Sequence, residues 1–152
     1  MARKSCINIG NCGEYFVAAE LERRGFDVAV PMSNTPTFDL LAIQLDDISK
    51  QVAIQVKTNS GSNNNWKLNK KNEIINDKNV FYVFVKLNGL ETPEYYIVPS
   101  EVVATQISET HKTWLTTLGK KGQPHNDNPM RVFHLPPDAN SKYKNNWDLM
   151  KK

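Results

Sequence analysis

Two short apolar stretches, FDLLAI at residues 38–43 and VAIQVKT at residues 52–58, decide the fold that we expect. Their length and their aliphatic, β-branched content are typical of strands buried in a sheet. The first stretch nevertheless carries Asp39, and the second carries Gln55 and Lys57. Because a polar group buried without a partner costs free energy, and a charge costs more, these residues either satisfy one another structurally or form a site.

The spacing of these stretches predicts an antiparallel hairpin. A loop of about five residues is a common hairpin length, and here it would span residues 45–49. A loop at this position determines the register of the hairpin, in which Ile43 is paired with Gln51, Leu41 with Ala53, and Asp39 with Gln55. Since side chains alternate between faces, one face becomes continuously apolar: Leu40, Ala42, Val52, Ile54 and Val56. Asp39, Gln55 and Lys57 then converge at one edge of the hairpin, on the opposite face.

A helix is expected before the strands, over residues 13–24 (GEYFVAAELERR), and Gly25 is the type of residue that ends a helix. At about 100° per residue, one stripe of this helix combines apolar residues with an acid: Val17, Ala18, Leu21 and Glu14. If this stripe packs onto the polar face of the hairpin, Glu14 joins Asp39 and Gln55.

Further elements are expected on both sides of the hairpin. These are strands at residues 26–30, 79–87 and 95–98, and a helix from Ser100, as its N-cap, to Gly119. Residues 58–73 are the most polar interval and are expected to form a loop with a short helix at its end. This order predicts an α/β domain with a mixed central sheet flanked by helices. We expect a single domain over residues 1–152, with its core over about residues 10–100 and extra C-terminal helices over about 100–152.

The composition is that of an ordinary globular protein, with 39% hydrophobic and 23% charged residues. No apolar stretch approaches the roughly 20 residues that span a bilayer, and the N-terminal residues lack the continuous apolar region of a signal peptide. We therefore expect a cytoplasmic protein with no membrane partner, and reduced thiols at Cys6 and Cys12. The net charge of +3 is compatible with nucleic acid without being diagnostic of it.

The polar positions of the hairpin have the chemistry of a divalent-metal site. Mg²⁺ prefers oxygen ligands, keeps several waters and typically uses one or two carboxylates; Mn²⁺ can substitute for it. Asp39 supplies a carboxylate, Gln55 an amide oxygen and Val56 a backbone carbonyl, while Glu14 can hold a coordinated water. Lys57 can orient or deprotonate the attacking water, or stabilise charge on a phosphate.

The pattern GE…L…G, then FDLLAI, then QVK resembles the PD-(D/E)XK nuclease superfamily, which includes restriction endonucleases and archaeal Holliday-junction resolvases. The resemblance covers about the first 100 residues in order and spacing. It implies a restriction-endonuclease-like αβββαβ core, dependence on Mg²⁺ and hydrolysis of phosphodiester bonds in DNA. By position, Glu14 is similar to the first-helix acid, Asp39 to the metal-binding aspartate and Lys57 to the catalytic lysine.

Two positions depart from the superfamily pattern. Phe38 precedes the aspartate where a proline is usual, at a position that the superfamily varies freely. Gln55 stands at the (D/E) position. An amide oxygen can bind a hard cation, and active restriction enzymes with glutamine here exist in the superfamily. The site nevertheless loses one negative charge, so metal binding is expected to be weaker.

Several cationic and aromatic residues are candidates for nucleic-acid contacts: Arg23, Arg24, Trp66, Lys67, Lys70 and Lys71. The lysines follow directly after the proposed site in the chain and would give sequence-independent affinity for phosphates. Trp66 either stacks on a base or belongs to the core. The two arginines either contact phosphates or are ordinary cations at a helix terminus.

These observations lead us to expect an Mg²⁺-dependent DNA endonuclease. Cutting both strands of a duplex needs two sites, so a homodimer is plausible, and a partner protein is one possible source of specificity. The first alternative is a catalytically weak or inactive module of the same fold that binds nucleic acid or a partner in a defence or mobile-element system. The second is a structural domain whose polar cluster is an internal hydrogen-bond network. The amino-acid sequence does not decide whether the substrate is DNA or RNA. It also leaves open which nucleotide sequence or structure is recognised.

Overall fold

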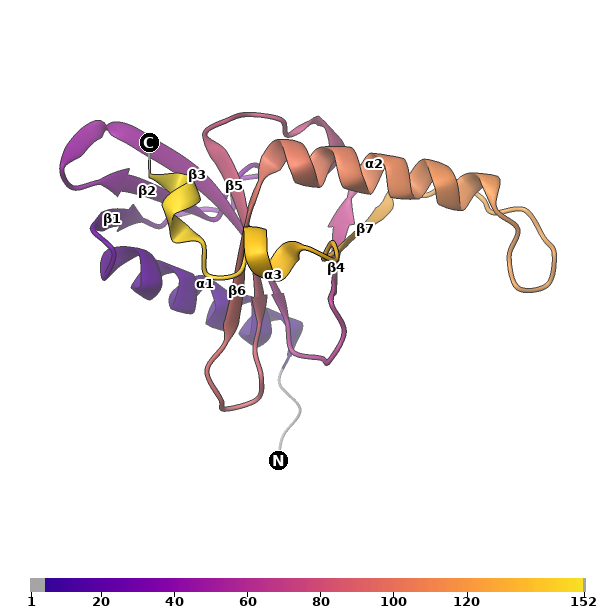
Figure 1. Cartoon of the computed structure of the whole chain (residues 1–152), viewed down its shortest axis with the longest axis horizontal. Helices are drawn as coiled ribbons and strands as arrows, with labels where there is room; N and C mark the ends of the chain where they lie inside the picture. Colours follow the sequence, from indigo (N-terminus) through magenta and orange to yellow (C-terminus); the bar gives the residue numbers. More distant parts are fainter. Residues whose placement is uncertain (1–4, 152) are drawn as a thin grey trace.

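A computed structural model describes residues 5–151 and has a central sheet of five strands. In spatial order these are β1 (Phe26–Ala29), β2 (Leu40–Gln44), β3 (Asp47–Asn59), β5 (Val80–Lys86) and β6 (Glu94–Pro99). The pair β3–β5 is parallel, and all other neighbours in this sheet are antiparallel (Figure 1). The expected mixed α/β architecture is therefore confirmed.

The β2–β3 hairpin has the expected register. The structure shows the pairs Leu41 with Ala53 and Ile43 with Gln51. The turn is tighter than expected, because β3 begins at Asp47 and the register shifts between Ile43 and Gln44. This irregularity lets a short turn replace the longer loop, while the pairs from Leu40 to Ile43 keep the expected register.

The first helix, α1 (Cys6–Glu22), covers the apolar face of the hairpin (Figure 1). Val17 and Leu21 are fully buried and pack in one cluster with the expected apolar set: Leu40, Ala42, Val52, Ile54 and Val56. The condition under which Glu14 would join Gln55, packing of α1 onto the polar face, is not met, because burying these two side chains against apolar residues stabilises the fold more than burying them against polar groups. The helix ends as expected before Gly25, which has φ +86°.

The opposite face of the sheet packs against α2 (Ser100–Thr116) and a two-stranded sheet of β4 (Asn65–Asn69) and β7 (Met130–His134). β4 was not expected, since it lies in the polar interval that suggests a loop. It is followed by a 3₁₀-helix, η1 (Lys70–Ile74), where a short helix was expected. Two further short elements complete the chain: α3 (Ala139–Lys142) and η2 (Trp147–Met150).

Ser100 does not cap α2, although its position suggested it. The N-cap is Pro99, and the Ser100 hydroxyl instead donates to the carbonyl oxygen of Asp77 at 2.8 Å and accepts from its N–H at 3.0 Å. This buried serine therefore ties the start of α2 to the segment before β5.

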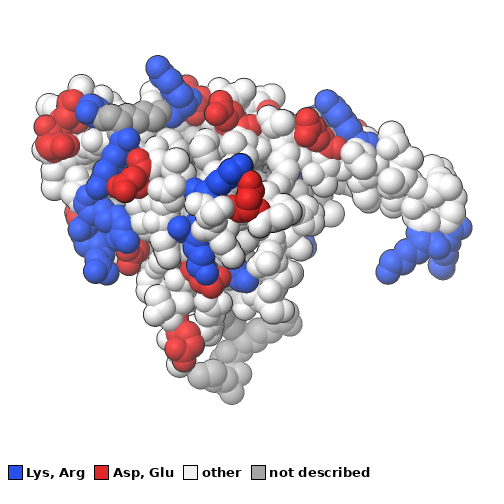
Figure 2. All heavy atoms as spheres, in the orientation of Figure 1, with Lys and Arg blue, Asp and Glu red and all other residues white. Residues whose placement is uncertain are grey.

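The C-terminal half of α2 and the loop of residues 117–129 project from the body of the protein (Figure 1). Cationic side chains cover the tip of this loop (Figure 2), where the sequence has Lys120 and Lys121. The loop is held by Trp114, whose ring stacks with those of His111 and His125 at centroid distances of 5.4 and 4.1 Å. Within residues 5–151, no helix is long and apolar enough to cross a membrane.

Candidate nuclease site

Asp39 is fixed at the open end of the β2–β3 hairpin. It directly precedes β2, and its backbone N–H donates to the carbonyl oxygen of Ile54 at 2.7 Å. Its carboxylate oxygen Oδ2 accepts from the backbone N–H of Val56 at 2.8 Å. The side chain therefore continues the hydrogen bonding of the hairpin beyond the end of β2, so the backbone of β3 determines where this negative charge lies.

Glu14 approaches Asp39 from the other layer of the protein. The two acids line one cleft of about 160 Å³, between α1 and residues 30–38. Burial raises the pKa of Glu14 above its ordinary value, and the negative charge of Asp39 raises it further, whereas the positive charge of Lys57 lowers it. The structure thus brings Glu14 and Asp39 into one cleft, with Lys57 close enough for its charge to act on Glu14, although α1 packs on the apolar face of the hairpin.

Gln55 is buried, and both ends of its side-chain amide are hydrogen-bonded. Nε2 donates to the carbonyl oxygen of Thr37 at 2.8 Å and to that of Pro36 at 3.4 Å. Oε1 accepts from Nδ2 of Asn72 at 3.3 Å. An ionised acid at this position would place an oxygen that can only accept against two carbonyl oxygens. The pocket therefore suits the amide of glutamine, which is a physical reason for the departure from an acid.

Asn72 determines which way the Gln55 amide is turned. The backbone N–H of Asn69 donates to Oδ1 of Asn72 at 2.9 Å in the capping box of η1, so Nδ2 faces Gln55. Nδ2 also donates to the hydroxyl of Tyr82 at 2.9 Å. Burial raises the pKa of Tyr82 to about 12; the Asn72 hydrogen bond lowers it and the charge of Asp39 raises it. Tyr82 is therefore a neutral hydroxyl in this network.

The two carboxylates form a donor set that suits a divalent cation. Two like charges in one half-buried cleft repel each other, as the raised pKa of Glu14 indicates, and a cation between them would relieve this repulsion. Within residues 5–151, no group of three His, Cys, Asp or Glu side chains could hold a metal ion. A cation here would therefore also need neutral ligands, such as the second lone pair of Gln55 Oε1, a backbone carbonyl and water.

Trp66 belongs to the core, so the structure selects one of the two alternatives left open by the sequence. Only 3% of this residue is exposed, and its ring lies 5.1 Å from that of Phe84. Its Nε1 donates to the carbonyl oxygen of Val85 at 3.3 Å. Stacking of a base on the ring of Trp66 would require this packing to be broken, so the residue contributes to a surface groove only through its place in the wall beside Lys67.

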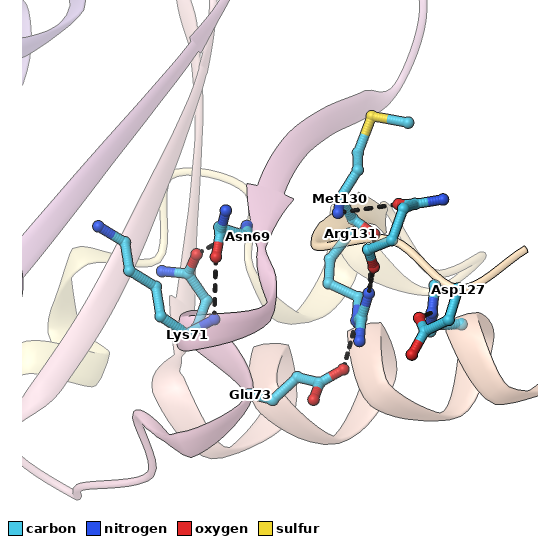
Figure 3. Close-up of polar contacts among 9 residues, drawn as sticks. Asn69, Lys71, Glu73, Asp127, Met130 and Arg131 are labelled. Atoms are coloured by element: carbon cyan, nitrogen blue, oxygen red, sulfur yellow. Dashed lines mark hydrogen bonds and ion pairs between the residues drawn. The ribbon is translucent and has the colours of Figure 1, made fainter.

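The three lysines after the site are all exposed but differ in position: Lys67, Lys70 and Lys71. Lys67 lines a groove together with Lys57. Lys70 and Lys71 belong to η1, whose Glu73 forms an ion pair with the buried Arg131 of β7. Figure 3 shows Lys71 extending away from this ion pair, so its charge remains available to a ligand.

Arg23 and Arg24 lie at the far end of α1 and have partners within the chain. Both pair with Glu20, and the guanidinium of Arg24 lies 4.9 Å from the ring centroid of Trp147. At a rise of 1.5 Å per residue, they are about 14 Å from Glu14 along the helix axis. We therefore do not include them in the proposed site.

Asn72 and Tyr82 were not expected at the site. Tyr82 lies in a strand of apolar and aromatic residues, and Asn72 lies in a polar interval rich in asparagine and lysine. The one available signal is the spacing of Asn69 and Asn72, which is that of a capping box at the start of a short helix. It predicts a turn but not the contact with Gln55.

No protein-family model and no curated protein sequence matches this chain. Among solved structures, the chain is similar to that of the bacterial homing endonuclease I-Ssp6803I, with a TM-score of 0.48 and 22% sequence identity. The aligned region covers 66% of this chain and 69% of that chain. At this level the likeness does not bear on individual site residues, which must be judged from their own geometry.

Proposed function

We propose that this protein is a metal-dependent endonuclease that hydrolyses phosphodiester bonds in DNA. The observation that carries the proposal is the convergence of Glu14 and Asp39 in one half-buried cleft beside Lys57. Two acids and a lysine at the end of a β-hairpin can hold a divalent cation and act on a phosphate. The proposed cofactor is Mg²⁺, or Mn²⁺ in its place.

Each residue has a distinct role in this proposal. Asp39 would hold the cation directly and Glu14 through a coordinated water, with Gln55 Oε1 and the Val56 carbonyl as further ligands. The cation would neutralise charge on the phosphate and lower the pKa of a bound water. Lys57 orients the attacking water or stabilises the charge that develops on the phosphate oxygens. The hydrogen bond from the Val56 N–H keeps one oxygen of Asp39 in place while the other remains free for the cation.

A second candidate function is DNA binding without cleavage. The observation that favours it is the Gln55 amide, whose Oε1 already accepts from Asn72 and whose Nε2 faces backbone carbonyls. With glutamine in this place, the cleft has only two carboxylates, and metal affinity is reduced accordingly. A module of this kind would keep the fold and the lysines while losing turnover.

Cleavage of supercoiled plasmid in Mg²⁺, Mn²⁺ or EDTA tests the proposal. We expect nicked or linear DNA with either metal, no cleavage in EDTA and loss of cleavage in Asp39→Asn. Asp27→Asn is the matched control, because Asp27 is an exposed acid on the neighbouring strand β1 and should not affect cleavage. DNA binding without cleavage in any metal would instead support the second candidate.

A further inference from the structure

A second hollow lies one turn of α1 away from the acidic cleft. It is a groove of about 360 Å³ between the N-terminal half of α1 and the connection from β3 to β4. Gly10 lines the helix side, and Lys57 and Lys67 line the other side, together with the small polar side chains of Ser60 and Asn63. None of the described lining residues is acidic. The groove therefore combines cationic and hydrogen-bonding side chains with the apolar Ile9 and Trp66, and it includes the proposed catalytic lysine in its wall.

Two glycines on one stripe of α1 face this region, and only one of them has a packing reason. Residues 6, 10 and 13 share a helix face. A Cβ at Gly13 would lie 1.9 Å from Oγ1 of Thr58, so the close approach of α1 to β3 requires glycine there. A Cβ at Gly10 would meet no described atom within 4 Å. Glycine inside a helix costs stability relative to alanine, and at Gly10 nothing in the packing of residues 5–151 explains that cost.

The wall opposite Gly10 is organised by hydrogen bonds of one residue. Asn59 organises the loop: its Nδ2 donates to the carbonyl oxygens of Asn63 at 3.1 Å and Asn65 at 3.0 Å, and its Oδ1 accepts from the N–H of Gly61 at 2.7 Å. These bonds fix the conformation of the loop from within. The groove is thus preformed, and the absence of a side chain at Gly10 keeps it open.

The groove and the acidic cleft are lined by neighbouring turns of α1. Glu14 lies four residues after Gly10 and lines the cleft with Asp39, while Lys57 lines the groove. The charge of Lys57 acts on Glu14, since it lowers the pKa of that carboxyl. A strand whose phosphate lies at the cleft would therefore pass Lys57 and enter the groove.

We propose that this groove binds the sugar–phosphate backbone of the DNA strand next to the cleavage position, and that Gly10 keeps it open for that backbone. The inference rests on the proposed function for its choice of DNA. Lys57 and Lys67 neutralise phosphates, and the hydroxyl and amide side chains of Ser60 and Asn63 hydrogen-bond to phosphate and sugar oxygens. Contacts of this kind give affinity and register without reading sequence.

Filling the groove at Gly10 tests the inference. The assay is fluorescence anisotropy with a labelled DNA duplex in EDTA, so that no cleavage occurs. Gly10→Leu places a side chain in the groove without adding charge or an aromatic ring, and we expect Kd to rise about tenfold or more. Gly10→Ala is the matched control: it should bind within about twofold of wild type and unfold at a higher temperature. Equal binding by all three proteins, each folded by circular dichroism, would overturn the inference.

Cys6 offers a second readout that needs no variant in the groove. Its exposed thiol lines the groove, whereas Cys12 does not. The measurement uses a Cys12→Ser background, so that a maleimide alkylates only Cys6. A saturating concentration of the DNA duplex should slow this alkylation about tenfold, because DNA in the groove excludes the reagent. An unchanged alkylation rate on saturated protein would contradict the inference.

These measurements separate the groove from catalysis. If wild type binds DNA and never cleaves it, while Gly10→Leu loses binding, the groove is supported and the nuclease proposal fails. If wild type cleaves DNA and Gly10→Leu binds and cleaves equally well, the nuclease proposal is supported and the groove is overturned. If wild type does not bind DNA at all, both fail.

Discussion

The side-chain amides of Asn72 and Gln55 meet in the core beside the candidate site, with Nδ2 of Asn72 donating to Oε1 of Gln55 at 3.3 Å. Both residues are almost fully buried. The backbone of η1 fixes Asn72, and Asn72 in turn fixes Gln55. The resemblance suggests an acid at position 55, but the surroundings of this side chain suit an amide. The contact with Asn72 allows this preference for glutamine over glutamate to be tested.

Gln55→Glu should destabilise the protein. The new carboxylate would face the carbonyl oxygens of Thr37 and Pro36, and we expect a loss of about 1–3 kcal/mol in the free energy of unfolding at pH 7. Urea denaturation measures this loss. Gln51→Glu is the control, because Gln51 is exposed on the same strand and its change should stay within about 0.5 kcal/mol. A Gln55→Glu protein as stable as wild type would show that the pocket does not select an amide.

Asn72→Ala should lower stability and also disturb the site. It leaves Gln55 Oε1 without its donor and removes the acceptor for the Asn69 N–H, at a cost of about 1–3 kcal/mol. Asn76→Ala serves as the control, since Asn76 is exposed just beyond η1. Chemical denaturation measures the free energy of unfolding of both variants. Equal stability of the two would contradict a structural role for Asn72.

Alanine at the two helix glycines should have opposite effects. Gly13→Ala forces a Cβ against Thr58 and should destabilise the protein by about 1–3 kcal/mol. Gly10→Ala meets no described neighbour and should stabilise by about 0.5–1 kcal/mol. Thermal denaturation compares them directly. Thr58→Ala should relieve part of the Gly13→Ala loss because it removes the hydroxyl that lies closest; no relief would mean that the close approach lies elsewhere.

The ion pair of Glu94 with Lys144 should give a small, pH-dependent contribution to stability. A hydrogen bond from Lys144 lowers the pKa of Glu94 below its ordinary 4.5. The contribution is therefore fully present above pH 4.5 and is lost as the pH falls through the lower pKa of the folded state. Because both side chains are about one-third exposed, we expect no more than about 1 kcal/mol.

Denaturation of wild type and Glu94→Gln across pH 2–7 measures this contribution. The difference between the two proteins should be constant near neutral pH and should shrink in acid below the ordinary pKa of a glutamate. A difference that persists unchanged at the lowest pH would show that packing rather than charge connects the C-terminal segment to β6.

Strong local patterns predicted the hairpin well. Alternation of apolar and polar residues determines which side chains of β2 and β3 share a face, and the apolar set from Leu40 to Val56 is buried as expected. Gly25 ends α1 because its backbone has a positive φ that glycine adopts readily. These features depend on a few neighbouring residues and are therefore visible in the sequence.

Contacts between distant segments were not predictable in the same way. β4 has only Trp66 and Leu68 as apolar residues, and it becomes a strand by pairing with β7, more than 60 residues later in the chain. Asn72 reaches Gln55 only once β3 and η1 lie side by side. The layer of α1 was left open for a related reason, because the sequence alone does not show which face of the hairpin Val17 and Leu21 cover.

The contribution of Lys57 to plasmid cleavage tests the central claim most directly. Lys57→Ala should abolish nicking in Mg²⁺ or Mn²⁺ while leaving the fold intact. Lys50→Ala, at an exposed lysine on the same strand that pairs with Asp47, should cleave like wild type. Metal-dependent cleavage that survives in Lys57→Ala, or that is lost equally in both variants, would contradict the assignment of this site.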